Sequence, residues 1–381
     1  MMINIAEIIE KKIDKSKWVE LKFSNICENI VEKVVPKKSN LNHYIGLKHL
    51  DSGSLKIRRY GQTLNLDGDK LKIYKGDIIF AKRNAYLKRV SIADFDAVAS
   101  AHSMVLRAKS KNISPQFLPF FLLSDLFWQK AIEISVGSLS PTINWKSLAK
   151  QQFSIPPIDQ QVKLSKILWS LNNLIEKEKE LHSSLDIFFR SKIKYISNNH
   201  THIGEYKKIS EVCTIKDNLR IPLNSKQRDN IKGDVPYYGA NGPVDSINKH
   251  IFDEDLVLIA EDGGNFKEFY SKEIAYRVSG KSWVNNHAHV LSVKSKLINT
   301  EWLLYSLMHK NILKSIIGTT RLKLNKSELE NIEIWVPSNK IIKLLSEEIK
   351  KINISRKQAL EKLKLSTHLQ KIIINKVFNV I

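Results

Sequence analysis

The sequence predicts a mixed α/β (α+β) fold in which two similar globular domains are joined by two long, antiparallel coiled-coil helices. Three observations predict it. The chain repeats itself, each copy ends in a long apolar stripe of helical period, and the part before each stripe alternates short β-like runs with turn residues. Two domains also fit a length of 381 residues, because one domain usually holds about 100 to 200 residues.

The internal repeat is clearest in the second part of each copy. Segments 136–171 and 317–352 align without a gap and share glycine, asparagine and proline positions. Nearer the start of each copy, Cys27 and Cys213 take equivalent places. We therefore expect a duplicated ancestral unit, with a pseudo-two-fold relation between its copies and cysteines that pack as small apolar side chains.

A long helix is predicted at the end of each copy, over residues 158–200 and 339–381. Apolar residues recur there mainly at steps of three and four, while Glu, Lys and Ser fill the other positions, which is coiled-coil spacing. A small globule cannot cover so long a stripe, so we expect the two helices to pair antiparallel. The alternative is that each helix packs only on its own globule.

The globular parts are predicted over residues 1–157, with an N-terminal extension at 1–17, and over residues 201–338. Within them, runs such as 78–80 and 256–259 have β-like composition and are bounded by Gly, Asp and Asn. Helical pieces lie between these runs, so each globule should mix helices and strands.

The charge of the chain favours a polyanionic partner. It carries 61 Lys and Arg residues against 39 Asp and Glu residues, a formal net charge of +22. Double-stranded DNA is the leading candidate, because neutralised phosphates release counterions, although a lysine-rich proteome would explain part of the excess. No stretch is apolar and long enough for a membrane span or a signal peptide, so a cytoplasmic protein without a membrane partner is expected.

An ordered set of short motifs covers nearly the whole chain. The motifs are Gly76-Asp-Ile-Ile-Phe80, Ile155-Pro-Pro-Ile-Asp-Gln-Gln161, Val235-Pro-Tyr-Tyr-Gly-Ala-Asn-Gly242, Asp255-Leu-Val-Leu-Ile-Ala260, and Ile317-Gly-Thr-Thr-Arg321 followed by Leu324-Asn325. With this set the chain resembles the specificity (S) subunit of type I restriction-modification systems. The second copy departs at 336–340, without the second proline and the glutamine, and the first at 136–140, without Thr-Thr-Arg. The two halves are therefore not expected to read DNA with the same residues.

The resemblance implies a non-catalytic subunit of a bacterial or archaeal adenine methyltransferase/endonuclease complex. Residues 1–157 and 201–338 would be target recognition domains, each reading one half of a split, asymmetric DNA sequence. The helices at 158–200 and 339–381 would set the gap between the halves and dock two methyltransferase (M) subunits. Restriction/translocase (R) subunits would join them, and S-adenosylmethionine, ATP and Mg²⁺ would bind only to these partners.

Motifs for catalysis are missing from the sequence itself. It has no Asn/Asp-Pro-Pro-aromatic motif of an adenine methyltransferase and no P-loop. The acidic run 253–255 and the pair His287 and His289 could bind a metal ion, but a solvated turn and a structural strand are the preferred interpretations, so no metal is predicted. The competing classes are a nuclease or fused methyltransferase, and a non-catalytic coiled-coil DNA-binding or adaptor protein outside restriction-modification.

Candidate DNA contacts are polar and basic residues in predicted loops, because Arg and Lys donate to guanine edges, Asn pairs with adenine edges, and further polar groups bind phosphates. In the first globule they are Arg58, Arg59, Lys82, Arg83, Asn84, Ser138 and Thr142. In the second they are Tyr238, Asn241, Asn265, Lys267, Thr319, Thr320, Arg321 and Lys323. Tyr238 could stack on DNA, support its loop or belong to the core, and solvated surface is the alternative for each Lys and Arg.

Overall fold

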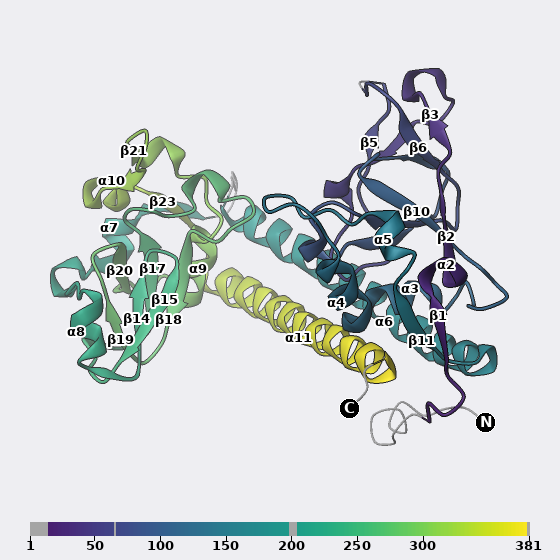
Figure 1. Cartoon of the computed structure of the whole chain (residues 1–381). Coiled ribbons are helices and arrows are strands. Elements are labelled where there is room, and N and C mark those ends of the chain that lie inside the picture. Colours follow the sequence, from purple (N-terminus) through teal and green to yellow (C-terminus); the bar gives the residue numbers. More distant parts are fainter. Residues whose placement is uncertain (1–13, 65, 198–203, 379–381) are drawn as a thin grey trace. The chain divides into compact units, whose positions relative to one another are not determined.

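The computed structural model describes residues 14–64, 66–197 and 204–378, so most of the predicted N-terminal extension 1–17 and the last residues of both predicted helices lie outside the described residues. The chain divides into two compact units (Figure 1). Unit 1 comprises Met1–Glu178 and Lys362–Ile381, and unit 2 comprises Lys179–Glu361. Among the described residues, no helix has the length and apolar character that crossing a membrane requires.

Unit 1 is built on a four-stranded antiparallel sheet with strand order β2-β10-β7-β8. The strands are β2 (Cys27–Ile30), β10 (Ser103–Ala108), β7 (Ile78–Ala81) and β8 (Val90–Ile92). All four residues of β7 are buried because the strand separates two cores. Ile78 and Phe80 face the core that contains helices α3 (Leu118–Leu123) and α4 (Asp125–Glu133), whereas Ile79 and Ala81 face the other core.

The second core of unit 1 lies against a five-stranded sheet of order β3-β6-β9-β4-β5. Its strands are β3 (Lys33–Val34), β6 (Lys70–Ile73), β9 (Ala97–Ala99), β4 (His43–Ile45) and β5 (Gly61–Gln62). A third, two-stranded sheet pairs β1 (Val19–Lys22) with β11 (Gln152–Ile155). The short helices are α2 (Phe23–Ile26), α5 (Trp145–Leu148) and the 3-10 turns η1 (Pro36–Lys38), η2 (Leu47–His49) and η3 (Ala85–Leu87).

Unit 2 repeats this plan, which confirms the predicted duplication. Its central sheet has the order β13-β20-β17-β18, formed by β13 (Cys213–Ile215), β20 (Ala288–Val293), β17 (Leu256–Ala260) and β18 (Ala275–Val278). Cys27 pairs with the last residue of β10, and Cys213 pairs with the last residue of β20, so the registers match. Both cysteines are buried, as expected, and burial raises the pKa of the Cys213 thiol to about 12.

The other elements of unit 2 surround this sheet. A second sheet has the order β15-β14-β19-β16, with β14 (Lys232–Gly239), β15 (Gly242–Ile247), β16 (Phe252–Asp253) and β19 (Lys281–Val284). Two-stranded sheets pair β12 (Glu205–Lys208) with β23 (Glu333–Val336) and β21 (Ile316–Ile317) with β22 (Lys323–Leu324). The helices are α7 (Ile209–Val212), α8 (Ser225–Asp229), α9 (Thr300–Leu307), α10 (Lys326–Glu330), η4 (Asp217–Leu219), η5 (Phe266–Glu268) and η6 (Leu313–Ser315). Helix α9 packs on β17 and β18.

Two helices of 40 residues each, α6 (Ile158–Ser197) and α11 (Asn339–Phe378), run through both units. In unit 1, Leu168 in the first half of α6 shares a core with Ile373 near the end of α11. In unit 2, Ile193 near the end of α6 shares a core with Ile349 near the start of α11. The pairing is therefore antiparallel, as predicted, and each helix is not confined to its own globule.

Candidate nucleic-acid interface

In each unit a buried strand of the central sheet ends at a loop, and a later segment of the same unit bonds to that loop. In unit 1 the strand is β7, the loop is 82–84 and the later segment is 136–143. In unit 2 the strand is β17, the loop is 261–265, and the later segment is the β21–β22 hairpin, 316–324. We call the loop and the later segment together the junction of the unit.

The backbone bonding of the two junctions is the same. The amide of Ile143 donates to the carbonyl of Lys82 at 2.8 Å, and the amide of Leu324 donates to the carbonyl of Glu261 at 2.8 Å. Isolated β-bridges complete the match, between Arg83 and Thr142 in unit 1 and between Asp262 and Lys323 in unit 2. Equivalent positions are therefore Lys82 and Glu261, Arg83 and Asp262, and Thr142 and Lys323.

The junction of unit 1 is a cationic surface. Lys82 and Arg83 are half-buried and form no ion pair within the described part of the chain; Arg83 Nη2 lies 3.5 Å from Ser140 Oγ. Burial, and then the charges of Arg83 and Lys82, lower the pKa of His102. Asn84 has a left-handed backbone with φ of 55°, and its Oδ1 has no hydrogen-bond partner among the described residues. Loop 82–84 thus carries two cations that form no ion pair with the described residues.

The other candidates of unit 1 fall in two places. Ser138 is exposed in segment 136–143, whereas Thr142 donates from Oγ1 to the Ser140 carbonyl at 2.9 Å. Arg58 and Arg59 lie outside the junction segments, and both guanidinium groups bind carboxylates. The pairs are Arg58 with Glu176 of α6 and Arg59 with Asp51. The structure therefore brings Lys82, Arg83, Asn84, Ser138 and Thr142 into one junction, without the two earlier arginines.

The junction of unit 2 carries its cations on the hairpin. Arg321 Nη2 donates to Asp262 Oδ1 at 2.8 Å, while 68% of the Arg321 side chain is exposed. Lys323 Nζ lies 3.1 Å from Glu261 Oε1. Gly318 turns the hairpin with φ of +90°, and a Cβ there would lie 2.3 Å from the Arg321 carbonyl oxygen, so only glycine fits.

Further candidates gather at the same junction. Asn241, at the β14–β15 turn, donates from Nδ2 to the carbonyl of Gly263 at 3.0 Å, so that turn is tied to loop 261–265. Thr319 and Thr320 are exposed in the hairpin turn. Residues far apart in the sequence thus meet at one junction.

Three candidates of unit 2 form no hydrogen bond or ion pair with the hairpin in the described part of the chain. Asn265 donates to the carbonyl of Glu273 at 3.4 Å, and Lys267 is exposed on η5. Tyr238 is half-buried, its ring centroid lies 5.9 Å from that of Tyr276, and burial raises its pKa. Of the interpretations open for Tyr238, these contacts favour packing within unit 2.

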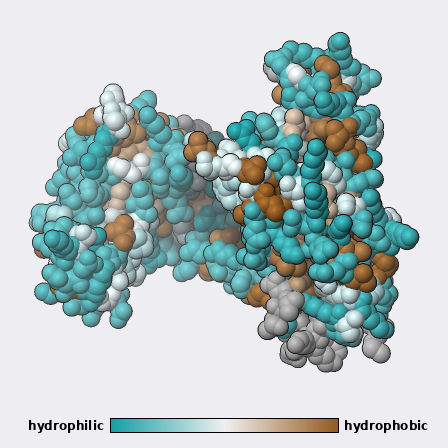
Figure 2. Space-filling model, in the orientation of Figure 1, coloured by the Kyte–Doolittle hydropathy of each residue, from teal (hydrophilic) through white to brown (hydrophobic). Residues whose placement is uncertain are grey.

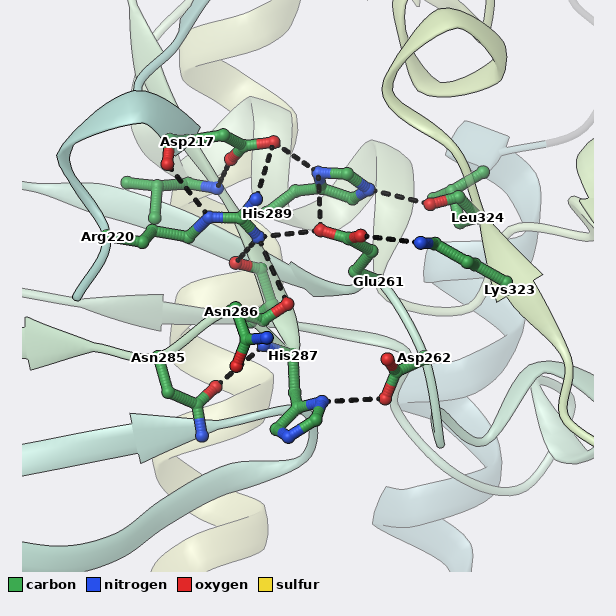
Figure 3. A network of polar contacts seen from close by, with 12 residues as sticks. Asp217, Arg220, Glu261, Asp262, Asn285, Asn286, His287, His289, Lys323 and Leu324 are labelled. Carbon is green, nitrogen blue, oxygen red and sulfur yellow. Dashed lines mark hydrogen bonds and ion pairs between the residues drawn. The ribbon is translucent and has the colours of Figure 1, made fainter. Parts of the chain in front are cut away.

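A buried ion network lies under the unit 2 junction, and sequence reasoning missed most of it (Figure 3). His289 is 1% exposed, and its Nδ1 lies 2.5 Å from Asp217 Oδ2 while its Nε2 lies 2.8 Å from the carbonyl of Leu324. Arg220 Nη1 donates to Glu261 Oε2 at 2.8 Å. The only signal in the sequence is the two-residue spacing of His287, which lies just before β20, and His289, which lies within it, whereas Asp217 and Arg220 come from a distant turn.

Asp217, Glu261 and His289 are residue types that bind metal ions, and their potential ligand atoms lie within 4.8 Å of one another. Both ring nitrogens of His289, however, already lie at hydrogen-bond distance from oxygen atoms of unit 2, Nδ1 from Asp217 Oδ2 and Nε2 from the carbonyl of Leu324. The arrangement is suited to fix the hairpin: Leu324 of β22 is held by His289, and its neighbour Lys323 is held by Glu261.

The carboxyl groups of this network are held ionised. Burial by itself would raise the pKa of Asp217, but hydrogen bonds from His289 and the Val290 amide and the charge of Arg220 bring it below its ordinary value of 3.8. The same balance lowers the pKa of Glu261, where burial is outweighed by Arg220 and Lys323.

Unit 2 is therefore expected to lose stability in acid. Because these pKa values are lower in the folded chain than in the unfolded chain, the stabilisation is complete above the unfolded values and disappears as the pH falls through the folded ones. The free energy of unfolding of unit 2 should begin to fall below about pH 4.5. Hydrogen–deuterium exchange at pH 7 and pH 3.5, corrected for intrinsic rates, should show β20 and β22 losing protection; unchanged protection there would contradict this.

Comparison with known proteins assigns the family. The family described as type I restriction modification DNA specificity domain matches residues 15–186 and 204–365. A putative type I restriction enzyme specificity subunit of Haemophilus influenzae is 39% identical over 145 residues, which cover 37% of this chain and 36% of that protein. The EcoDI specificity subunit of Escherichia coli is 29% identical over 171 residues, 42% of this chain and 37% of that protein. The matched segments thus span less than half the length of these relatives.

Solved structures with the same fold cover nearly the whole chain. The S subunit of a type I restriction-modification system from M. genitalium has a TM-score of 0.67 at 13% identity, covering 98% of both chains. A chain from work on complex assembly and conformational transition of the type I R-M system has a TM-score of 0.53 at 17% identity, covering 96% of this chain and 98% of that one. With two matched copies, two similar units and antiparallel helices α6 and α11, the chain belongs to the type I restriction-modification DNA specificity domain family.

Proposed function

We propose that the chain is the non-catalytic, DNA-reading specificity subunit of a type I restriction-modification complex. Residues 1–157 and 201–338 each read one half of a split target, and the helices predicted over 158–200 and 339–381 set the unspecified gap. The observation that supports this most directly is the repeated junction, in which a loop after a buried strand and a later segment present polar and basic side chains together in each unit.

The charges at the two junctions suit DNA. The proposed contacts in unit 1 are Lys82, Arg83 and Asn84, since the two cations form no ion pair within the described residues and Asn84 follows them in the same loop. In unit 2, Arg321 keeps most of its side chain exposed although one nitrogen is bound. Arginine can then offer its remaining donors to a guanine edge, and lysine to phosphates.

The helices offer surface for protein partners. Several large apolar side chains on α6 and α11 are exposed although most of the visible surface is hydrophilic (Figure 2). Among them are Leu174, Leu181, Ile187 and Phe188 on α6, and Leu344, Ile354, Leu365 and Ile372 on α11. Exposed apolar residues of this kind support docking of two M subunits on the helices. S-adenosylmethionine, ATP and Mg²⁺ would then enter with the M and R subunits, in a bacterial or archaeal cytoplasm.

Methylation mapping tests the proposed function as a whole. The chain is expressed with its M partner in cells that lack other adenine methyltransferases, and methylated adenines are located across the genome. The expected result is one sequence of two defined parts separated by a gap of constant length. The proposal is rejected by a complex that assembles but modifies no such sequence, and the adaptor alternative then takes its place.

DNA binding by the purified chain is expected to depend steeply on salt. If about six or more phosphates are contacted, affinity should fall at least about a thousandfold between 50 and 200 mM salt. Fluorescence anisotropy with a labelled random duplex measures the slope of log affinity against log salt. A flat slope, or no binding at the lower salt concentration, would mean that the surplus of Lys and Arg is incidental.

A further inference from the structure

The two junctions have the same backbone bonding but opposite charges at equivalent positions. After β7 the loop begins with Lys82 and Arg83, whereas after β17 it begins with Glu261 and Asp262. The change is not a shift in register, because the first loop residue of each unit donates from its amide to the carbonyl of the residue just before an equivalent strand. The acceptor is His102, before β10, at 3.2 Å in unit 1, and His287, before β20, at 2.8 Å in unit 2.

The later segment of each junction, 136–143 in unit 1 and the β21–β22 hairpin in unit 2, compensates for this difference in loop charge. Facing Arg83 in unit 1 is the hydroxyl of Ser140, at 3.5 Å. Facing Asp262 in unit 2 is Arg321, at 2.8 Å, in the position that aligns with Ser140 in the repeat. Each junction therefore has one arginine in this pair of facing positions, on the loop in unit 1 and on the hairpin in unit 2.

Asp262 fixes where the arginine of unit 2 points. Its Oδ1 accepts from Arg321 Nη2 at 2.8 Å and lies 2.8 Å from His287 Nδ1. Two partners hold the carboxylate. Burial by itself would raise the pKa of Asp262, but the hydrogen bonds from Arg321 and His287 outweigh burial and bring the pKa below its ordinary value. A charge-assisted hydrogen bond from one nitrogen orients the planar guanidinium and leaves its other donors directed outward.

We propose that the two units read guanine at this junction with arginines from opposite sides: Arg83 of the loop in unit 1, and Arg321 of the hairpin in unit 2, with Asp262 as the positioning residue of Arg321. This inference rests on the proposed function and assigns the base contact within it. In unit 1 the position equivalent to Asp262 is occupied by Arg83 itself, so only the second half-site depends on a carboxylate.

The effect of Asp262→Asn on DNA binding distinguishes a positioning role of Asp262 from simple charge repulsion of DNA. Removing a negative charge beside DNA strengthens binding to every sequence if the carboxylate has no other role. If Asp262 positions Arg321, Asp262→Asn instead lowers discrimination for one guanine in the second half-site by about tenfold or more, because the bidentate contact is loosened. Binding to random DNA should stay the same or increase, and the first half-site should be read as before.

The experiment uses the complex with its M partner, after mapping has identified the target. Affinities are compared for the target duplex and for duplexes with each base pair of either half-site replaced. We expect Arg321→Ala and Asp262→Asn to relax the same position of the second half-site, and Arg83→Ala to relax one position of the first. Arg321→Lys is the matched control: it keeps the charge but loses the planar fork, and should lose discrimination while binding random DNA normally.

Two results would overturn the inference. One is tighter binding of the Asp262→Asn complex to all duplexes with discrimination unchanged. The other is an equal loss for all duplexes with Arg321→Ala, which would make Arg321 a phosphate contact. Unaltered thermal unfolding of each variant is required, and Arg321→Lys replaces Arg321→Ala if the latter unfolds early. Failure of the proposed function can be told apart from failure of this inference, because the wild-type complex would then methylate no split sequence.

Discussion

Inserting seven residues into each long helix is expected to lengthen the unspecified gap of the DNA target by about three base pairs. Seven helical residues add about 10 Å, and one base pair of duplex takes about 3.4 Å. Two turns also nearly preserve the face on which the apolar stripe lies, so pairing should survive. The insertions belong where the helices pass from one unit to the other, after Glu178 in α6 and before Lys362 in α11. Methylation mapping then gives the new gap, and the original target should be lost.

Matched variants make this result interpretable. Because α6 and α11 pair antiparallel, an insertion into only one of them should disrupt the pairing and abolish methylation. Replacing seven exposed helix residues by alanine, without insertion, should leave the gap unchanged. A double insertion that methylates the original sequence with the original gap would show that the helices do not set the distance between the half-sites.

Asp217→Ala is expected to lower the free energy of unfolding of unit 2 by about 1 to 3 kcal/mol, because it leaves buried hydrogen-bond donors without an acceptor. The substitution removes the carboxylate that accepts hydrogen bonds from His289 and the Val290 amide, and it takes away one of the two acidic partners of Arg220, which keeps its ion pair with Glu261. Urea unfolding followed by hydrogen exchange measures the two units separately. Unit 1 should be unaffected, because every contact of this network lies in unit 2.

Glu268→Ala serves as the matched control for Asp217→Ala. It removes an acidic residue of the same unit from an exposed ion pair with Lys272, and such pairs contribute little. A similar loss of stability in both variants would show that charge removal in general, and not the buried network, determines the effect. A stable Asp217→Ala protein that still binds target DNA would contradict the assigned role of the network in holding the hairpin.

The architecture was predictable because the amino-acid sequence contains an internal repeat and a periodic pattern of apolar residues. The apolar residues of α6 recur every three to four positions. This period specifies a helix with one buried face, whichever element that face packs against. The repeat around Cys27 and Cys213 showed that two units must share a topology, and the strand registers of both cysteines agree. Such patterns depend only on neighbours in the sequence or on comparison of one half with the other.

The candidate site was predictable only in part. Lys82, Arg83 and Asn84 follow a recognisable strand, and Arg321 follows a recognisable motif, so residue type and position were enough to select them. Arg58 satisfied the same criteria, yet it binds Glu176 on α6. Nothing in the sequence distinguishes a cation that already has an internal partner from one that has none.

Duplication, helix pairing, strand content and a cationic loop were determined by the sequence alone, since periodicity, repetition and composition are local properties. The tertiary structure decided which charges meet. Asp217 and His289 are 72 residues apart, and Asp262 and Arg321 are 59 residues apart. Whether such pairs form depends on how the strand ends, the turn and the hairpin close on one another in space. That closure places an acidic residue under the hairpin arginine in one unit and a hydroxyl beside the loop arginine in the other.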